Sequence, residues 1–380
     1  MNILGDHIVS RGGSINPSRF PDEIFELYSI PAHDRGSADI VRGSNIGSSK
    51  QLVQPGDVLI SKIIPHIRRV RVVGPDQGYR QIASGEWIVF RTQAYDPGYL
   101  RHYLLSNRFH AQYMNTVAGV GGSLVRARPQ FVRKLQAPLP ELEEQRRIAA
   151  ILDKADAIRT KRRQALHIQR SLVAAQFSLR FGDPMGSSQR FPKRRLGDIS
   201  RIIRGASPRP AGDPRYFGGE IPWLKISDLT AEPSATVRDI RETVTEAGAA
   251  KSVLLPPNTL ILSNSATVGI AKIIEPASCI HDGFLAFLDL DEKVDKRWLQ
   301  AALELSRPRV ASLAPEGTQK NLNGPIVKGI RLQIPPLDLQ LEFLAESRKI
   351  DRLIASTAQA LDHDDALFAS LQSRAFKGEL

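Results

Sequence analysis

The sequence has a single cysteine, no long apolar run and no signal peptide. Cys279 alone excludes an internal disulfide framework and a cysteine-rich zinc site, and is typical of a small buried side chain in a reducing compartment. No stretch approaches the roughly eighteen apolar residues of a membrane span. The start MNILGDHIVSRGG lacks the basic and apolar regions of a signal peptide. We therefore expect a cytoplasmic protein with no membrane partner.

Catalytic signatures are missing as well. The chain has no GxxxxGK[ST], HExxH or GxSxG pattern, and no NPPF or DPPY stretch of an amino-methyltransferase. The glycine-rich residues 117–124 fail the spacing of a dinucleotide-binding loop. The acidic residues beside His363 point in different directions on a helix, so they favour a solvated face over a metal site. We expect no catalysis, no metal and no bound cofactor in this chain.

Charge is the most informative feature of the composition. The 380 residues include 52 Lys and Arg against 40 Asp and Glu, a formal net charge of +12. Such an excess attracts polyanions, so nucleic acid is the leading partner, with an unspecialised basic enzyme as the alternative. The length predicts at least two domains.

The chain also repeats itself. Similar segments return in the same order, offset by 192, 201, 199 and 197 residues (196 − 4, 256 − 55, 298 − 99 and 332 − 135). Short β-branched runs with glycine and proline between them predict mixed α/β domains rich in strands. A period this long indicates duplication of a whole domain with its helix rather than a solenoid. The repeated segments are LGD at Leu4 and Leu196, PGDVLIS and PPNTLIL at Pro55 and Pro256, YLRHYLLSNRF and WLQAALELSRP at Tyr99 and Trp298, and LQAPLPEL and LQIPPLDL at Leu135 and Leu332.

A long helix is predicted at the end of each copy. The first should begin near Glu141, after a proline-rich stretch and with acidic residues in its first turn, and stop near Phe181 before a glycine. The second should run from Asp338 to about Phe376. Helices of this length need a partner, so we expect the two to pack against each other antiparallel. The alternative is that each helix lies across the core of its own domain.

Polar residues interrupt the heptad-like apolar stripe of both helices. They are Arg162 and Gln169 in the first helix and Thr357 and Asp364 in the second.

Basic and amide side chains gather in the loops and strand ends of both copies. Arg reads guanine, while Asn and Gln read adenine, so this inventory suits DNA recognition. For any one residue a solvated charge or a strand-edge role is the competing interpretation. The candidate DNA-binding residues are Lys62, Arg68, Arg69, Arg71, Arg126, Arg128, Lys134, Arg204, Arg209, Lys225, Gln319, Lys320, Asn321 and Asn323.

At this point the sequence resembles the specificity subunits of type I restriction-modification systems. The resemblance rests on the following segments: PLPELEEQRRIAAILDKADAI, its diverged copy PPLDLQLEFLAESRKIDRLI, QPGDVLISKI, IPWLKISDL, GTQKNLNG and the ending LFASLQSRAFKGEL. The resemblance covers essentially the whole chain. The first helix start and the C-terminal ending are its most specific parts.

The resemblance implies a fold and a division into domains. The implied fold is α+β, with two mixed α/β target recognition domains separated by two long helices packed as an antiparallel coiled coil, in a pseudo-twofold internal duplication. The domains would be 1–137, the first target recognition domain; 138–184, the central spacer helix; 185–334, the second target recognition domain; and 335–380, the C-terminal spacer helix.

The resemblance also implies partners. The chain would bind a bipartite, gapped site in double-stranded DNA and dock two methyltransferase subunits, which carry S-adenosylmethionine; an endonuclease subunit that uses ATP with Mg can join. The second long helix lacks the EEQ sequence that begins the first one. We therefore expect the stronger contact with the methyltransferase subunit at the start of the first helix. The candidate partner-binding residues there are Glu144, Gln145, Arg146, Ile148, Ile151 and Leu152.

A ruler hypothesis follows, in which the helical spacer sets the number of unread base pairs between two half-sites, each read in a major groove. Three rivals stay open at this point. They are an autonomous sequence-specific DNA-binding regulator, a specificity factor of another antiphage defence system, and a nuclease or methyltransferase acting alone.

Overall fold

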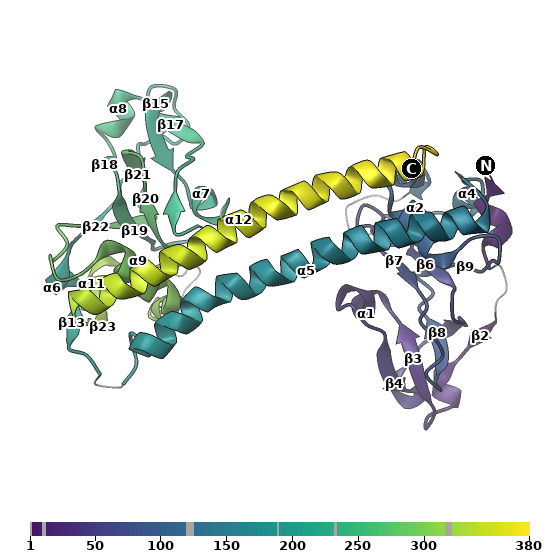
Figure 1. Ribbon diagram of the computed structural model, residues 1–380. Coiled ribbons are helices and arrows are strands. Elements are labelled where there is room, and N and C mark those ends of the chain that lie inside the picture. Colours follow the sequence, from purple (N-terminus) through teal and green to yellow (C-terminus); the bar gives the residue numbers. More distant parts are fainter. Residues whose placement is uncertain (1, 10–12, 119–124, 188–189, 232–233, 316–320) are drawn as a thin grey trace. The chain divides into compact units, whose positions relative to one another are not determined.

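The computed structural model describes residues 2–9, 13–118, 125–187, 190–231, 234–315 and 321–380. The chain divides into two compact units (Figure 1). Unit 1 consists of Met1–Gln164 and Gln359–Leu380, and unit 2 consists of Ala165–Ala358. Each unit holds one strand-rich module and a portion of both long helices.

Unit 1 contains two main sheets. The three-stranded sheet has β6 at its centre, and all four side chains of this VLIS strand are buried because both of its faces are covered. The sheets, in spatial order, are β2 (Ser14–Ile15), β5 (Lys50–Leu52), β8 (Arg80–Ala83), β3 (Ile24–Tyr28) and β4 (Asp39–Arg42); β7 (Val70–Val72), β6 (Val58–Ser61) and β9 (Trp87–Phe90); β10 (Val117–Ala118) with β11 (Arg126–Ala127); and β1 (Asn2–Ile3) with β12 (Gln136–Ala137). Short helices connect them, namely η1 (Leu4–His7), η2 (Pro17–Arg19), α1 (Ile30–Asp34), η3 (Gly43–Asn45), α2 (Pro97–Leu105), α3 (Asn107–Met114) and α4 (Pro129–Val132).

Unit 2 contains a five-stranded and a four-stranded sheet. Its central strand β19 (TLILS) is buried along its whole length. The sheets are β14 (Arg201–Arg204), β22 (Phe284–Leu288), β19 (Thr259–Ser263), β20 (Ala271–Ile274) and β16 (Thr236–Val237); β17 (Glu242–Val244), β15 (Phe217–Leu224), β21 (Ser278–Ile280) and β18 (Val253–Leu255); and β13 (Lys193–Arg195) with β23 (Arg331–Gln333). The short helices are α6 (Leu196–Ile199), α7 (Ile226–Ala231), α8 (Glu246–Ala249), α9 (Lys296–Leu305), α10 (Arg307–Ser312) and α11 (Gly324–Gly329).

The two modules close in the same way. In unit 1 the first strand β1 pairs antiparallel with β12, and in unit 2 β13 pairs antiparallel with β23. Four residues (138–141) separate the closing strand of the first module from α5, and three residues (334–336) separate that of the second module from α12. The ends of each module therefore meet where its helix starts.

The two long helices are confirmed close to their predicted limits. Helix α5 spans Leu142–Phe181 and α12 spans Leu337–Ala375. Acidic residues lie in the first turn of each, and Gly182 and Gly378 beyond their C-terminal ends have the positive φ that favours glycine.

The helices are antiparallel in both units. In unit 1 Arg162 pairs with Asp364 at 2.6 Å, and in unit 2 Gln169 donates to the Thr357 hydroxyl at 3.2 Å. The polar interruptions of the two apolar stripes thus meet each other. Each helix also packs on the core of a module. The helices therefore pack both against each other and across the module cores, so the two alternatives are both observed.

Aromatic side chains cover the attachment of each helix end. In unit 1 Phe376, beyond α12, lies 5.5 and 5.2 Å from the rings of Tyr99 and Tyr103 on α2. In unit 2 Phe181, at the end of α5, lies 5.9 Å from Trp298 on α9. Each module is therefore held by the start of the helix that follows it and by the end of the other long helix.

Two smaller features complete the description. Cys279 is fully buried in β21, as a small apolar side chain is expected to be. Within the described part of the chain, none of the helices combines the length and the apolarity that crossing a membrane requires.

Candidate nucleic-acid interface and helix attachment

A hollow of about 380 Å³ lies in the unit 2 module. It lies where the loop after β14 meets strands β15 and β17 and the turn after β21. Aromatic and charged side chains line it together, and they include Arg209, Phe217, Trp223, Lys225, Glu242 and His281. A concave site that combines rings with charges of both signs can stack on and hydrogen-bond to a polar ligand.

The charges of the hollow are arranged as donors and acceptors. Lys225 Nζ lies 3.3 Å from a carboxylate oxygen of Glu242, and both side chains are partly exposed. The Arg209 side chain is exposed at the rim. The Nδ1 atom of His281 accepts from the backbone N–H of Gly283 at 2.9 Å, and burial lowers the pKa of this imidazole. At neutral pH the hollow thus offers cationic donors, a carboxylate acceptor and a neutral ring.

Arg204 is held beside this hollow. Its Nε donates to the carbonyl oxygen of Asp282 at 2.7 Å. The hydroxyl of Ser207, which lines the hollow, donates to the Asp282 carboxylate, and this hydrogen bond lowers the pKa of Asp282. Three predicted DNA-binding residues, Arg204, Arg209 and Lys225, are therefore brought near one another.

Sequence reasoning missed the other members of this cluster. Trp223 and Glu242 stand on neighbouring strands that pair antiparallel, and His281 follows the strand on the other side of β15. Only the pairing of these strands brings the three side chains together, and the sequence gives no signal of that pairing.

The predicted DNA-binding residues of unit 1 fall into two groups. Arg69 makes a bidentate ion pair with Asp34 at 2.7 and 2.8 Å, and Arg71 donates to the Gly36 carbonyl at 2.9 Å. These two residues hold the α1 region against β7. Arg68 likewise donates to the Leu105 carbonyl at 3.0 Å. The structural role of these three arginines was not predicted from the sequence.

The second group is displayed to solvent. Arg128 and Lys134 flank the exposed ring of Phe131, with cation-to-centroid distances of 5.7 and 5.8 Å. Arg126 is exposed and lies 3.3 Å from Glu86, and Lys62 is half-buried after β6. An exposed ring between two cations is a surface suited to nucleic acid.

The amide residues of the GTQKNLNG segment give a mixed result. Gln319 and Lys320 lie outside the described residues. Asn321 is exposed. Asn323 is the N-cap of α11, because its side-chain oxygen accepts from the Ile326 N–H at 2.9 Å. Its amide oxygen thus has a structural partner, while the residue itself is exposed, so Asn323 stays a predicted DNA-binding residue.

Gln145 has a structural role at the start of α5. Its side chain is fully buried, accepts from the Asp96 N–H at 2.8 Å, and donates to the carbonyls of Ala94 and Pro140 at 3.0 and 2.8 Å. Asp96 is in turn the N-cap of α2. Since all of these groups are inside unit 1, Gln145 has no surface left for a partner, which corrects its predicted role.

The second helix start repeats this arrangement. Gln340 is also fully buried, accepts from the Asp295 N–H at 2.8 Å, and donates to the carbonyls of Lys293 and Pro335 at 3.0 and 2.8 Å. Asp295 caps α9 as Asp96 caps α2. The two helix starts are therefore equivalent in this glutamine, although their sequences differ around it.

The other candidate partner-binding residues divide by burial. Ile148 and Leu152 are buried in the core of unit 1, so they are not exposed to a partner. Ile151 is half-buried, and Arg146 is exposed. Glu144 forms a bidentate ion pair with Arg147 at 2.7 and 2.8 Å, which lowers the pKa of its carboxyl.

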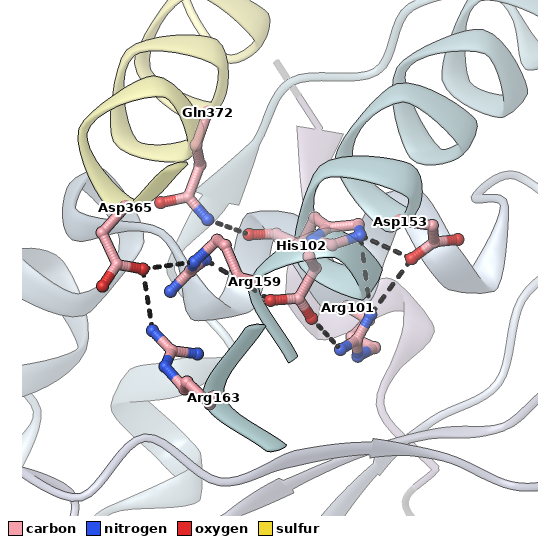
Figure 2. Close-up of polar contacts among 8 residues, drawn as sticks. Arg101, His102, Asp153, Arg159, Arg163, Asp365 and Gln372 are labelled. Carbon is pink, nitrogen blue, oxygen red and sulfur yellow. Dashed lines mark hydrogen bonds and ion pairs between the residues drawn. The ribbon is translucent and has the colours of Figure 1, made fainter. Parts of the chain in front are cut away.

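A polar network fills the space between α2, α5 and α12 in unit 1, and Figure 2 shows it. His102 is 1% exposed and its Nε2 lies 2.7 Å from Asp153. Arg159 pairs with Asp365 at 2.5 Å and lies 4.1 Å over the Phe368 ring. Burial lowers the pKa of His102. Over the described residues, no group of three or more His, Cys, Asp or Glu is placed to hold a metal ion.

Comparison with known proteins agrees with this picture. Residues 189–363 match the family model described as type I restriction modification DNA specificity domain. The type I restriction enzyme MjaVIII specificity subunit of Methanocaldococcus jannaschii is 21% identical over 249 residues, which are 59% of this chain and 57% of that protein. The match thus spans a little over half the length of that relative.

Two solved structures share the fold. One, from work on complex assembly and conformational transition of the type I R-M system, has a TM-score of 0.66 at 21% identity and covers 100% of this chain and 97% of that chain. The other, the type I restriction-modification S subunit from M. genitalium, has a TM-score of 0.56 at 13% identity and covers 99% and 95%.

The class defined by these observations is a fold with two strand-rich modules and two long antiparallel helices. Residues 189–363 are thus similar to the DNA specificity domain of type I restriction-modification systems, and the chain as a whole shares the fold of the two solved structures.

Proposed function

We propose that the modules of unit 1 and unit 2 each read one half of a bipartite, gapped site in double-stranded DNA. The observation that carries the proposal is the unit 2 hollow, where Arg209, Lys225 and Glu242 lie together inside the stretch that matches a DNA specificity domain. An arginine fork fits the acceptors of guanine, and a carboxylate accepts from the amino group of cytosine. The exposed surface around Phe131 is the corresponding candidate in unit 1.

In this proposal the chain selects the DNA sequence on which a larger complex acts. Two methyltransferase subunits bring S-adenosylmethionine and methylate the site, and an endonuclease subunit that uses ATP with Mg can join them. The chain itself contributes recognition and supplies no catalytic group. The chain purified alone should therefore transfer no methyl group from S-adenosylmethionine to DNA. Methylation by the chain without its partner subunits would contradict this division of roles.

The main test is methylation sequencing of cells that express this chain with its methyltransferase subunit. Arg209→Ala should relax or change the half-site read by unit 2 and leave the other half-site unchanged. A contact of this kind discriminates between bases by about 1–3 kcal/mol. Lys349→Ala, at an exposed position of α12 in the same unit, is the matched control. If the methylated motif is unchanged in Arg209→Ala, the unit 2 hollow is not part of the surface that reads DNA.

Phosphate contacts should dominate the affinity for DNA. Binding should weaken steeply as salt is raised, because each neutralised phosphate releases counterions. Replacing Lys134 by Ala should lower the slope of log affinity against log salt by about 1 without changing either half-site.

The spacing between the half-sites is a separate prediction. Removing one helical turn from both α5 and α12 should change the number of unread base pairs, because the ruler hypothesis assigns the gap to the helices. Changed half-sites in such a variant, at an unchanged gap, would refute the ruler.

A further inference from the structure

The hollow of unit 2 lies on one face of its four-stranded sheet. Trp223 on β15 pairs with Glu242 on β17 and with Cys279 on β21. Side chains two residues apart in a strand point to the same face. Lys225 and His281 follow these positions by two residues, and both line the hollow together with the tryptophan. A row of carboxylate, indole, ammonium and imidazole groups therefore crosses three neighbouring strands.

Unit 1 has the same strands without these side chains. Its strand β3 also lies between an antiparallel neighbour, β4, and a parallel one, β8. Leu27 of β3 takes the position of the tryptophan, with Asp39 opposite it on β4. Ser29 takes the position of Lys225 and caps α1. The scaffold is thus shared, while the rings and the ammonium group belong to unit 2, which favours a role in reading the sequence particular to that unit.

The aromatic wall of the hollow lies too deep to touch a base that stays in the duplex. Trp223 is 2% exposed, and its ring centroid lies 5.9 Å from those of Phe217 and His281. Base edges in the major groove are read by side chains that project into a groove about 8.5 Å deep. A ligand therefore meets this wall only by entering the hollow, whose volume of about 380 Å³ lies at the lower end of the range for small-molecule sites.

The tryptophan also has an unused donor. The Nε1–H group of Trp223 is buried and has no acceptor among the residues that the structure describes. Indole is a donor only, and a buried donor without an acceptor costs free energy. This favours a ligand that carries acceptors, as every nucleobase does.

The charged pair in the hollow can bind the Watson–Crick edge of a base. Lys225 Nζ lies 3.3 Å from an oxygen of Glu242, and the two side chains are 37% and 55% exposed, so a ligand can reach both. An ammonium group has three donors and a carboxylate about four acceptor positions, so their mutual contact leaves others for a ligand. Cytosine matches such a pair, because its amino group donates and the ring nitrogen beside it accepts.

Arg209 at the rim selects cytosine over the other bases. Its side chain is exposed, and a guanidinium fork fits the O6 and N7 acceptors of guanine. Of the four bases that can leave a duplex, only cytosine leaves a guanine behind. The rim and the interior of the hollow therefore fit the two members of one G·C pair.

We propose that the unit 2 hollow receives a cytosine turned out of the DNA duplex. The base lies against Trp223, its amino group donates to Glu242, and its N3 atom accepts from Lys225. Arg209 binds the guanine that stays in the duplex. The inference rests on the proposed function, because it specifies how unit 2 reads its half-site. It adds that this half-site contains a G·C pair that opens on binding.

The test weakens one base pair without changing its major groove. The full chain with its methyltransferase subunit is titrated with a duplex carrying the motif found by methylation sequencing. Inosine replaces, one at a time, each guanine paired to a cytosine in the half-site that Arg209→Ala alters. Inosine keeps O6 and N7, but its pair with cytosine lacks one hydrogen bond. At one position, wild type should therefore bind about threefold to tenfold more tightly, because a weakly paired base costs less to turn out.

Controls and a second readout accompany this titration. Inosine in the unread gap should leave the affinity unchanged. Glu242→Ala should lose the gain from inosine, because the cytosine then stays in the stack. Glu220→Ala removes an exposed carboxylate from the same sheet, outside the lining of the hollow, and should keep the gain. Pyrrolocytosine, a fluorescent analogue, should change its emission at the target position on binding wild type and not on binding Glu242→Ala.

The outcomes separate this inference from the proposed function. If inosine changes nothing while Arg209→Ala still alters the half-site, the base is read in the groove, and the inference is overturned while the proposed function stands. If inosine weakens binding, unit 2 reads the guanine amino group in the minor groove, and the inference is overturned. A half-site without a G·C pair overturns it as well. If neither Arg209→Ala nor Glu242→Ala alters the motif or the affinity, the hollow does not read DNA and the observation behind the proposed function fails too.

Discussion

Unit 1 and unit 2 attach the long helices in the same way and differ in what lies beside the attachment. In both, a fully buried glutamine, Gln145 or Gln340, ties a helix start to the cap of the neighbouring short helix. In both, a phenylalanine, Phe376 or Phe181, covers an aromatic face. Next to this attachment unit 1 has an ion-pair network and unit 2 has a cavity. The duplicated chain thus keeps the contacts that hold its helices and varies the surface beside them.

The aromatic attachment should give the largest effects on stability. Phe181→Ala and Phe376→Ala should each lower the free energy of unfolding by about 3–5 kcal/mol, since both side chains are buried and leave cavities. Phe181 should cost more, because it packs against Phe177, Trp298 and Phe343. Denaturant unfolding gives the magnitude. Hydrogen exchange should show the loss in unit 2 for Phe181→Ala and in unit 1 for Phe376→Ala, and the reverse pattern would contradict the assignment.

The glutamine attachment should come next. Gln145→Ala and Gln340→Ala should each cost about 2–3 kcal/mol, because each leaves one N–H and two carbonyl groups without their buried partner. The two values should agree, since the hydrogen bonds are the same in both units. Gln359→Ala, at an exposed position of α12, is the control and should change little. A large effect in one unit alone would break the equivalence of the two helix starts.

The polar pairs between the helices should have smaller effects, with opposite signs. Arg162→Leu alone leaves Asp364 without its partner and should cost about 1–3 kcal/mol. Replacing Gln169 and Thr357 together by Leu should be neutral or stabilising by about 1 kcal/mol, because a neutral polar contact gives way to apolar packing. Thermal unfolding at low and high salt separates the two, since the charged pair of unit 1 is screened and the neutral pair of unit 2 is not.

The smallest effect concerns pH and is confined to unit 1. Burial lowers the pKa of His102 below the value of about 6.5 that it has when unfolded. The unfolded chain therefore takes up the proton more readily, so the stabilising contribution is present above about pH 6.5 and is lost as the pH falls below it. His102→Gln should reduce the loss of protection in α2 on going from pH 7.5 to 5.5. Unit 2 has Ala301 at this position and should show no counterpart in α9. Hydrogen exchange at the two pH values checks both statements.

The long helices could be predicted because their limits are encoded locally. Prolines, acidic first turns and following glycines are all visible in the sequence, and α5 and α12 begin and end within a residue or two of the predicted positions. The antiparallel pairing of the two helices was predicted as well, because helices of this length need a partner.

Long-range partners could not be predicted in this way. Arg69 was assigned to DNA because its ion-pair partner Asp34 lies 35 residues earlier in the chain, where nothing marks the pair. Gln340 was overlooked because the proline-rich segment before it changes the offset between the copies from 197 to 195 residues. The unit 2 hollow depends on strand pairing that brings Glu242 beside Trp223, and side-chain composition alone does not specify that pairing.

The covering of Tyr99 and Tyr103 by Phe376 also constrains how the protein is made. Unit 2 is one continuous stretch, so it can complete its aromatic core during synthesis. Unit 1 needs residues 359–380, which leave the ribosome long after its module does. Until then, the tyrosines of the first module lack their cover. A chain terminated shortly before Phe376 therefore exposes apolar surface in the domain that was made first, where chaperones and proteases can detect it.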